Sequence, residues 1–223
     1  LEGPNGLLHS FAGLNEVPHE WEVDPDPRSI LSVWAKPYPT LGDNVAVVSA
    51  ALALREKGLD PDTIASVEVH QNAHFASYPG TSFRGPYERP AQAMASTAYA
   101  VASTLLHGRL EYQRYTTKLQ DPGTTALIER LTVVPEKSYG YVDGMVVVTL
   151  KDGSTRTQAA KDLDQTLFYR DRASAQEAFA ALLHETGYGE DLVTSVSTTL
   201  FSAVENPTTT SIRTVIESLG IGE

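Results

Sequence analysis

The strongest constraint on the fold is an Asp-Gly turn between two strand-forming runs. Lys151-Asp152-Gly153-Ser154 separates the near-continuous apolar segment Met145–Leu150 from Thr155–Ala159. An Asp-Gly pair in this setting predicts a β-hairpin, because both residues tolerate the backbone angles of a tight turn. A further strand is predicted over Ile64–Val69, where apolar and polar residues alternate. The chain is therefore expected to contain a β-sheet with at least one antiparallel pair.

Helical patterns precede and separate the predicted strands. A helix is expected over about Asn44–Lys57, with Asp43 as its N-cap and Gly58 as its stop signal. A second, Ala-rich helix is expected over Ala91–His107. The pair Asp121-Pro122 is typical of a helix start, since Asp suits the N-cap and Pro the first helical position. Helices and strands in this order indicate an α+β fold.

The pattern becomes helical after about residue 162. Residues 1–162 are therefore expected to form an α+β domain, and residues 163–223 a set of helices. Residues 72–90 are rich in Gly, Pro, Ser and aromatic residues and predict a long loop, and such loops in compact domains are often functional. Further helices are expected over Gly6–Gly13, Ala175–Glu185, Glu190–Val204 and Ser211–Leu219.

The charge balance excludes several classes of partner. The chain has 17 Lys and Arg against 28 Asp and Glu, a net charge of -11, so it has no general attraction to nucleic acid or to an anionic membrane surface. It has no apolar stretch of about 18 residues, which a transmembrane helix requires.

The absence of Cys excludes disulfides, thiolate metal sites and Cys nucleophiles. The sequence that starts at Leu1 is not a signal peptide, and we expect a fragment or a processed product.

Two histidines have the spacing of metal ligands on a helix. His70 and His74 are separated by three residues, but they follow the end of the predicted strand, and no Asp or Glu joins them at the spacing that a metal site needs. An ordinary pair of surface or loop side chains is the favoured interpretation. No metal site is predicted.

Lys36 is the most specific candidate for chemistry. It precedes Pro37-Tyr38-Pro39, in which the two prolines stiffen the backbone on both sides of Tyr38. A lysine on a stiff segment just before a helix could bind a carboxylate, or could act as an acid or base if it is buried. The alternative is an ordinary solvated lysine, and the residues alone leave both interpretations open.

Polar side chains also mark the Ala-rich helix and the loop before it. Ser96 and Tyr99 would share one face of the helix, and Gln92 extends this stripe. The stripe either packs closely against a neighbouring element or presents hydroxyl and amide groups to a pocket. In the loop, Arg84 and Arg89 either anchor an anion or are solvated.

Four stretches, taken in order, resemble the MmgE/PrpD family, whose members include 2-methylcitrate dehydratase, cis-aconitate decarboxylase and iminodisuccinate epimerase. The stretches are Leu1–Leu8, Lys36–Pro39 with the helix ending at Ala50–Leu54, Gln92–Ala102 with Leu105–Gly108, and Asp121-Pro122 with the strand and turn of Val146–Gly153. Together they extend over about residues 1–160. The ordered set carries the resemblance.

The resemblance implies an all-helical domain and a smaller α+β domain, with the active site in the cleft between them. Residues 1–162 would be the α+β domain, and residues 163–223 would return to the helical domain. The N-terminal part of the helical domain would be absent here and supplied in the same or a separate chain. The resemblance further implies a homodimer, a small-molecule carboxylate substrate and no metal or organic cofactor. It implies a cytoplasmic location, with the mitochondrial matrix as the alternative.

The resemblance also assigns site residues. Lys36 matches the active-site lysine of the family, and Tyr99 matches an active-site tyrosine in a Ser-x-x-Tyr segment that begins at Ser96. The family usually has His shortly after its lysine, whereas this sequence has Leu41 and Val45 at the expected positions. This departure matters because imidazole is a natural proton carrier near neutral pH.

Three explanations stay open for this departure: Asp43 or another group replaces the imidazole, the substrate differs, or lyase activity is lost. The first hypothesis is a lyase or isomerase that dehydrates, decarboxylates or epimerises an acid beside a carboxylate. Its expected catalytic residues are Lys36, Tyr99 and Asp43, and its expected substrate-binding residues are Ser96, Gln92, Tyr38, Arg84 and Arg89. The second is a family-fold protein without lyase activity that serves as a binding or partner subunit. The third is an acidic α+β domain whose resemblance is architectural alone.

Overall fold

The structure is a computed structural model, and it describes residues 9–10, 13–14, 36–163, 172–205 and 213. The chain divides into two compact units, Leu1–Trp34 and Ala35–Glu223. Of the first unit, His9 and Ser10 are helical, within the helix predicted over Gly6–Gly13. The rest of that prediction, and the helix predicted over Ser211–Leu219 apart from Arg213, lie outside the described residues. The second unit carries the fold.

A four-stranded sheet forms the scaffold, in the order β2-β1-β3-β4. The strands are β1 (Ile64–Asn72), β2 (Leu131–Glu136), β3 (Gly144–Leu150) and β4 (Thr155–Ala159). β1 runs parallel to β2 and antiparallel to β3, which pairs antiparallel with β4. The hairpin predicted around Asp152-Gly153 is confirmed, and so is the strand predicted from Ile64, which extends three residues further than expected.

β2 was not predicted, and Pro135 explains why. A proline inside a short apolar run argues against a strand, because it cannot donate a ladder hydrogen bond. The strand order places β2 at the edge of the sheet, where one side of the strand needs no partner. Pro135 is opposite Gln71 near the end of the pairing. An edge position thus accommodates a residue that a central strand would exclude.

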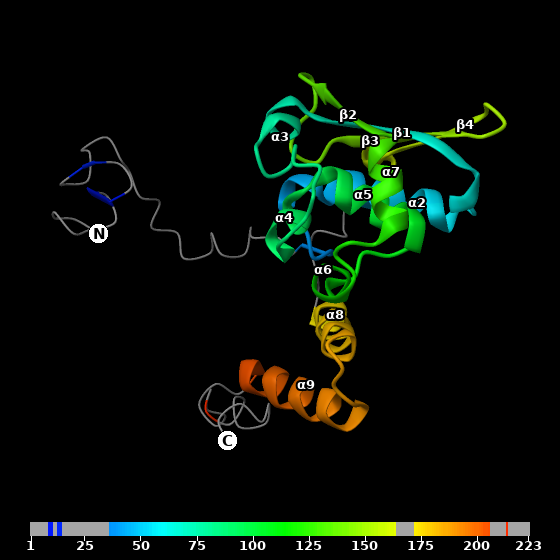
Figure 1. The fold of residues 1–223 in the computed structure, drawn as a ribbon. Helices are drawn as coiled ribbons and strands as arrows, with labels where there is room; N and C mark the ends of the chain where they lie inside the picture. Colours follow the sequence, from blue (N-terminus) through cyan, green and yellow to red (C-terminus); the bar gives the residue numbers. More distant parts are fainter. Residues whose placement is uncertain (1–8, 11–12, 15–35, 164–171, 206–212, 214–223) are drawn as a thin grey trace. The chain divides into compact units, whose positions relative to one another are not determined.

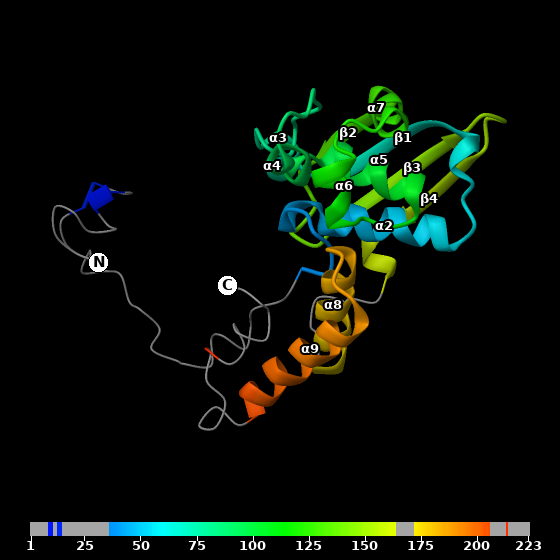
Figure 2. The ribbon, with the colours of Figure 1, turned by 60° about the horizontal axis from the view of Figure 1, so that its bottom comes forward.

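Helices α2 (Val45–Glu56) and α5 (Thr97–His107) pack against one face of the sheet, with α7 (Pro122–Glu129) beside them. Figures 1 and 2 show this layer of helices from two directions. The alternation of β1 fits a one-sided sheet: Val67 and Val69 are buried, whereas Glu68 between them is exposed. The fold is therefore a mixed fold of a sheet and helices, in agreement with the α+β prediction.

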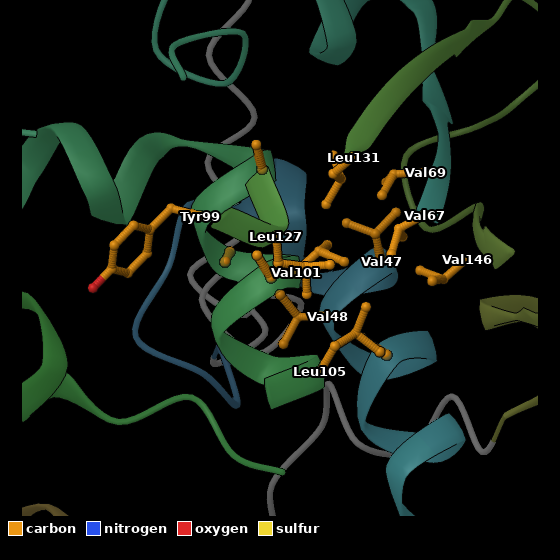
Figure 3. Packing of buried hydrophobic residues seen from close by; sticks show 14 of the residues in the cluster. Val47, Val48, Val67, Val69, Tyr99, Val101, Leu105, Leu127, Leu131 and Val146 are labelled. Atoms are coloured by element: carbon orange, nitrogen blue, oxygen red, sulfur yellow. The ribbon is translucent and has the colours of Figure 1, made fainter. Parts of the chain in front are cut away.

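The core lies between the sheet and these helices. Figure 3 shows buried aliphatic side chains from three elements pointing toward one centre: Val47 and Val48 of α2, Val101 and Leu105 of α5, and Val67 and Val69 of β1. Burying a valine or leucine completely contributes about 1.5–3 kcal/mol. Alanines are frequent at the buried positions of α2 and α5, and their small side chains let the two helices approach closely.

The remaining helices are α3 (Ala73–Ser77), α4 (Pro90–Ala95), α6 (Tyr112–Thr117), α8 (Arg172–Glu185) and α9 (Glu190–Glu205). α8 and α9 confirm the helices predicted over Ala175–Glu185 and Glu190–Val204. α6 is short and polar and was not predicted. Among the described helices, none is both long and apolar enough to cross a membrane.

Three sequence predictions need correction. Asp43 is not the N-cap of α2: it lies inside a 3₁₀ turn, Gly42–Asn44, and Asn44 occupies the cap position. The loop predicted over 72–90 contains the short helix α3. The Ala-rich helix is two helices, α4 and α5, because the backbone is extended at Ser96, with ψ 122°.

The break at Ser96 is stabilised by partners distant in sequence. The amide of Thr97 donates to the carbonyl of Thr81 at 3.1 Å rather than to the preceding turn. Ser96 Oγ accepts from the amide of Tyr99 at 3.1 Å and so caps α5. The composition of Ala91–His107 is that of one helix, and these tertiary contacts divide it.

Gly144 permits a close approach between β3 and α2, and we predict that Gly144→Ala destabilises the fold. An added Cβ would lie 2.8 Å from Val47 Cγ1 and 3.1 Å from Ala46 Cβ. Overpacking of this kind costs about 1–3 kcal/mol. Chemical denaturation should show this loss, whereas the control Gly189→Ala, whose Cβ would meet open space, should leave the midpoint unchanged.

Asp121 should make the stability of the fold fall in acid. Burial alone would raise the pKa of Asp121, but hydrogen bonds from the Thr124 hydroxyl and amide, at 2.6 and 2.9 Å, and the nearby His107 lower it overall. The unfolded chain therefore binds the proton more tightly, so the stabilisation is present above the ordinary Asp pKa of about 3.9 and is lost as the pH falls through the folded value.

The matched variant is Asp121→Asn, because Asn caps helices well but carries no charge. Denaturation midpoints measured from neutral pH down to pH about 3 should fall less steeply for Asp121→Asn than for the wild type. Equal slopes would show that this carboxylate contributes nothing to acid unfolding.

Candidate active site

The segment Lys36–Asp43 enters the fold through a chain of backbone hydrogen bonds. The amide of Thr40 donates to the carbonyl of Tyr38 at 2.8 Å, and the amide of Leu41 donates to the carbonyl of Met94 at 3.2 Å. With the two prolines, these bonds give the segment a defined path across the end of α4 to the start of α2. Two predicted catalytic residues, Lys36 and Asp43, therefore lie at opposite ends of one rigid piece of chain.

A buried network centred on Asn44 anchors this segment. Asn44 Nδ2 donates to Thr40 Oγ1 at 3.1 Å and to the carbonyl of Ala95 at 2.9 Å. Asn44 Oδ1 accepts from Thr97 Oγ1 at 2.7 Å, and Thr40 Oγ1 donates to the carbonyl of Met94 at 2.9 Å. The last carbonyls of α4 and the side chain of Asn44 thereby satisfy one another where no water reaches them.

Gln71 joins the end of β1 to the same network. Its Nε2 donates to the carbonyl of Asp43 at 2.7 Å, and its Oε1 lies 3.0 Å from Thr97 Oγ1. Asn44, Gln71 and Thr97 are each at most 1% exposed. Every member is uncharged, so the network holds its geometry across the pH range in which carboxylates and imidazoles titrate.

Lys36 and Tyr38 border a cavity of about 760 Å³ between their segment and α8. Leu110 and Phe179 give it an apolar wall, and Glu177 and Glu185 add carboxylates. Lys36 itself is exposed. The cavity thus brings two of the predicted site residues together, in surroundings that hold one cationic and two anionic side chains.

Tyr99 and Ser96 do not reach this cavity and lie in a buried aromatic cluster. The Tyr99 ring lies 5.0 Å from that of Tyr87 and 5.6 Å from that of Tyr115, and Figure 3 shows it on the side of α5 away from the aliphatic core. Ser96 Oγ donates to the carbonyl of Phe83 at 2.6 Å and lies 2.8 Å from the Tyr87 hydroxyl. The hydroxyl of Ser96 therefore stabilises the break between α4 and α5.

The hydroxyls of this cluster stay protonated near neutral pH. Burial raises the pKa of Tyr99 to about 12, and the neighbouring Arg114 offsets part of this rise. The Tyr99 hydroxyl donates weakly to the carbonyls of Arg114 and Lys118, at 3.4 and 3.5 Å. Burial also raises the pKa of Tyr115, and the side chain of Thr40 offsets part of this rise. In this arrangement Tyr99 can donate a proton but cannot serve as a base.

The other predicted binding residues lie elsewhere. Gln92 Oε1 accepts from the amides of Glu88 and Arg89, at 2.8 and 2.9 Å, which closes the start of α4. Arg89 is exposed at that start. Arg84 donates to the carbonyls of Ile128 and Leu131 and so ties its loop to the junction of α7 and β2. These contacts hold the loop together, and the structure places none of the three at the Lys36 cavity.

His70 lies within β1 and His74 lies on α3, so the two histidines belong to different elements. His70 Nδ1 lies 2.7 Å from Glu136 Oε1 on the neighbouring strand, whereas His74 is exposed on α3. Within the described ranges, no group of three or more His, Asp or Glu side chains is arranged to hold a metal ion. The strand-to-helix change after Asn72 directs the two imidazoles apart.

The chain was compared with known protein families and with known proteins. Residues 38–171, more than half of the chain, match the MmgE/PrpD C-terminal domain. A mitochondrial 2-methylcitrate dehydratase of Yarrowia lipolytica (strain CLIB 122 / E 150) is 30% identical over 111 residues, which is 45% of this chain and 21% of the relative. The chain thus spans only 21% of the length of the relative. Leu1–Leu8, the first stretch of the predicted resemblance, lies outside the match.

We predict that Thr97→Val weakens the fold although it keeps the side-chain shape. Removing the hydroxyl takes away the single proton that the buried carbonyl oxygens of Asn44 and Gln71 share, at 2.7 and 3.0 Å from Thr97 Oγ1, and such a loss costs about 1–3 kcal/mol. Thr116→Val, an exposed site on α6, is the matched control. Thermal melting should separate the two variants, and equal melting temperatures would refute a structural role for the network.

Proposed function

The chain belongs to the MmgE/PrpD family through its C-terminal domain, and from this premise we propose that it is a lyase or isomerase acting on a small polycarboxylate or related acid. The reaction would be dehydration, decarboxylation or epimerisation beside a carboxylate, without a metal or organic cofactor. Dehydration is the first choice, because the relative that was found is a 2-methylcitrate dehydratase.

The family match is the observation that carries this proposal. It begins at Tyr38, two positions after Lys36, and takes in Asp43, Ser96 and Tyr99. The cavity beside Lys36 supports the proposal, since an ammonium group at its border can bind a substrate carboxylate. Lys36 would hold the acid, and Asp43 would exchange a proton with it. Tyr99, which is only 1% exposed and lies outside this cavity, would have to be uncovered to donate a proton or a hydrogen bond.

The charges of the cavity argue that the site is completed by another domain. Among the described residues that line it, one is a lysine and two are glutamates, and the whole chain has a net charge of -11. A polycarboxylate would be repelled unless further cations face it. We propose that these cations belong to the helical domain of the family, in the same or a separate polypeptide. Arg84 would otherwise have to leave its present contacts with Ile128 and Leu131.

Assembly and location follow the family in this proposal. A homodimer is expected, with residues 163–223 contributing to the helical domain and residues 1–162 forming the α+β domain. The compartment would be the cytoplasm or the mitochondrial matrix, since the relative that was found is mitochondrial.

A second candidate function is a family member without lyase activity that acts as a binding or partner subunit. Leu41 and Val45 favour it, since both are apolar and Val45 is only 1% exposed, so neither can carry a proton. This alternative predicts that the chain binds a carboxylate or a helical partner without changing the acid.

We predict that Lys36→Ala abolishes turnover and leaves the fold intact. The gene product that carries this sequence would be incubated with citrate, 2-methylcitrate, cis-aconitate and iminodisuccinate, and the products followed by mass spectrometry. Loss of the lysine should reduce turnover by about a hundredfold or more, the usual size of an acid–base or charge contribution. An exposed lysine contributes little to stability, so the melting temperature should change by less than about 2 °C.

Lys151→Ala, in the exposed β3–β4 turn, is the matched control and should retain full activity. Full activity of Lys36→Ala would remove the assignment of Lys36. If the wild type turns over none of the acids but still binds one of them by calorimetry, the binding subunit becomes the better account.

A further inference from the structure

The hydroxyl of Tyr141 occupies space beside Gly42 that any other residue would fill with its side chain. An ideal Cβ on Gly42 would lie 2.5 Å from Tyr141 Oη and 3.7 Å from Tyr141 Cζ. The first distance is a clash, and the second is ordinary contact. Gly42 opens the turn that carries Asp43. The missing side chain at position 42 is therefore what admits a phenol to the start of α2.

Tyr141 is held in this place although its side chain is 48% exposed. Its ring meets Phe75 of α3 edge to face, with 5.1 Å between the centroids. The loop around it is closed by Asp143, whose Oδ2 accepts from the amide of Gly140 at 2.7 Å. One side of the ring is thus fixed by an aromatic contact, and the hydroxyl end rests against the backbone of Gly42.

Asp43 is anchored through its backbone and keeps its carboxylate available. Its carbonyl accepts from Gln71 Nε2 at 2.7 Å, which ties it to the buried network. Within the described part of the chain, the Asp43 carboxylate makes no hydrogen bond or ion pair. The side chain is partly buried. A fixed backbone with an uncommitted carboxylate is suited to exchanging a proton.

The phenol of Tyr141 and the carboxylate of Asp43 can take opposite roles in a proton transfer. Burial, and after it the negative charge of Asp43, raises the pKa of Tyr141. The neighbouring elements also carry His74, next to Phe75, and Asp143. Near neutral pH a phenol is therefore a proton donor, and an aspartate is an acceptor. The Tyr141 hydroxyl lies against Gly42, the residue before Asp43, and the carbonyl of Asp43 is bonded to Gln71 at the end of β1.

We propose that Tyr141 is a further catalytic residue of this protein, which acts with Asp43 as an acid–base pair on the hydroxy acid substrate. The pair lies at the Asp43 end of the Lys36–Asp43 segment. This inference rests on the proposed lyase function and names the proton donor of that reaction.

The step balances in a dehydration. Asp43 takes the proton from the carbon beside the carboxylate, and the electron pair of that C–H bond forms the C=C bond. The C–O bond breaks, and the departing oxygen takes the proton of Tyr141 and leaves as water. The protonated Asp43 then returns its proton to the Tyr141 phenolate. Both residues are restored, and no oxidant or reductant is consumed.

Turnover of 2-methylcitrate tests the catalytic role. Tyr141→Phe should lower kcat about a hundredfold or more and change KM much less, as expected for a lost acid. Tyr139→Phe, in the same loop, removes a hydroxyl that lies away from Gly42 and should keep wild-type kcat. Wild-type kcat in Tyr141→Phe would overturn the proposal.

A double-mutant cycle tests the geometry without activity. Gly42→Ala should lower the melting temperature of the wild type, because the new Cβ clashes with the hydroxyl of Tyr141. In the Tyr141→Phe background the clash is gone, and the same substitution should have little effect. An equal loss in both backgrounds would show that the hydroxyl does not occupy this space and would overturn the proposal.

Tyrosine titration followed by NMR of ζ-carbon-labelled protein separates this inference from the proposed function. The signal missing from Tyr141→Phe assigns Tyr141 among the 10 tyrosines. Asp43→Asn should shift its titration to lower pH. An unshifted titration in an active enzyme would overturn the pair alone, whereas a wild type without turnover of any acid would overturn the lyase function and, with it, the catalytic role of Tyr141.

Discussion

The geometry of the candidate site depends on one buried hydrogen-bond network, in which Asn44, Gln71 and Thr97 satisfy one another's amide and hydroxyl groups. Each of these residues comes from a different element: the turn before α2, the end of β1 and the start of α5. A network that is half satisfied would be costly, because its unpaired polar atoms are buried. The pairing of these groups therefore specifies how the three elements meet.

The hydrogen bonds of this network fix the position of the Lys36–Asp43 segment. The two ends of the segment lie in different surroundings. Lys36 borders a cavity that α8 helps to form, and Asp43 follows Gly42, which lies against Tyr141. Proton transfer and charge pairing both require groups held within a fraction of an ångström. Fixing the middle of the segment through Thr40 and Leu41 holds both ends without using the chemical groups themselves. The groups that hold the segment are therefore different from the side chains of Lys36 and Asp43, which are left for binding and proton exchange.

The parts of the fold that were predictable are those encoded locally. The Asp152-Gly153 turn and the Gly58 stop signal act within a few residues, so the hairpin and the end of α2 follow from the sequence. The break at Ser96 depends on Thr81, fifteen positions earlier, and no local propensity reveals it. β2 was obscured by Pro135, which is tolerated because of a strand order that only the tertiary structure defines.

The residues of the candidate site also differ in whether the local sequence reveals them. Prolines around Tyr38 make the Lys36 segment visible in the sequence, whereas Tyr141 is one aromatic residue of a loop and becomes notable through its contact with Gly42. The family pattern of histidines is absent at Leu41 and Val45, and this loss does not stand alone. A proton donor brought from another element needs space, and glycine at position 42 provides it. Under the proposed role of Tyr141, the departures from the family pattern become one rearrangement, in which the donor lies in the loop before β3 instead of the α2 segment.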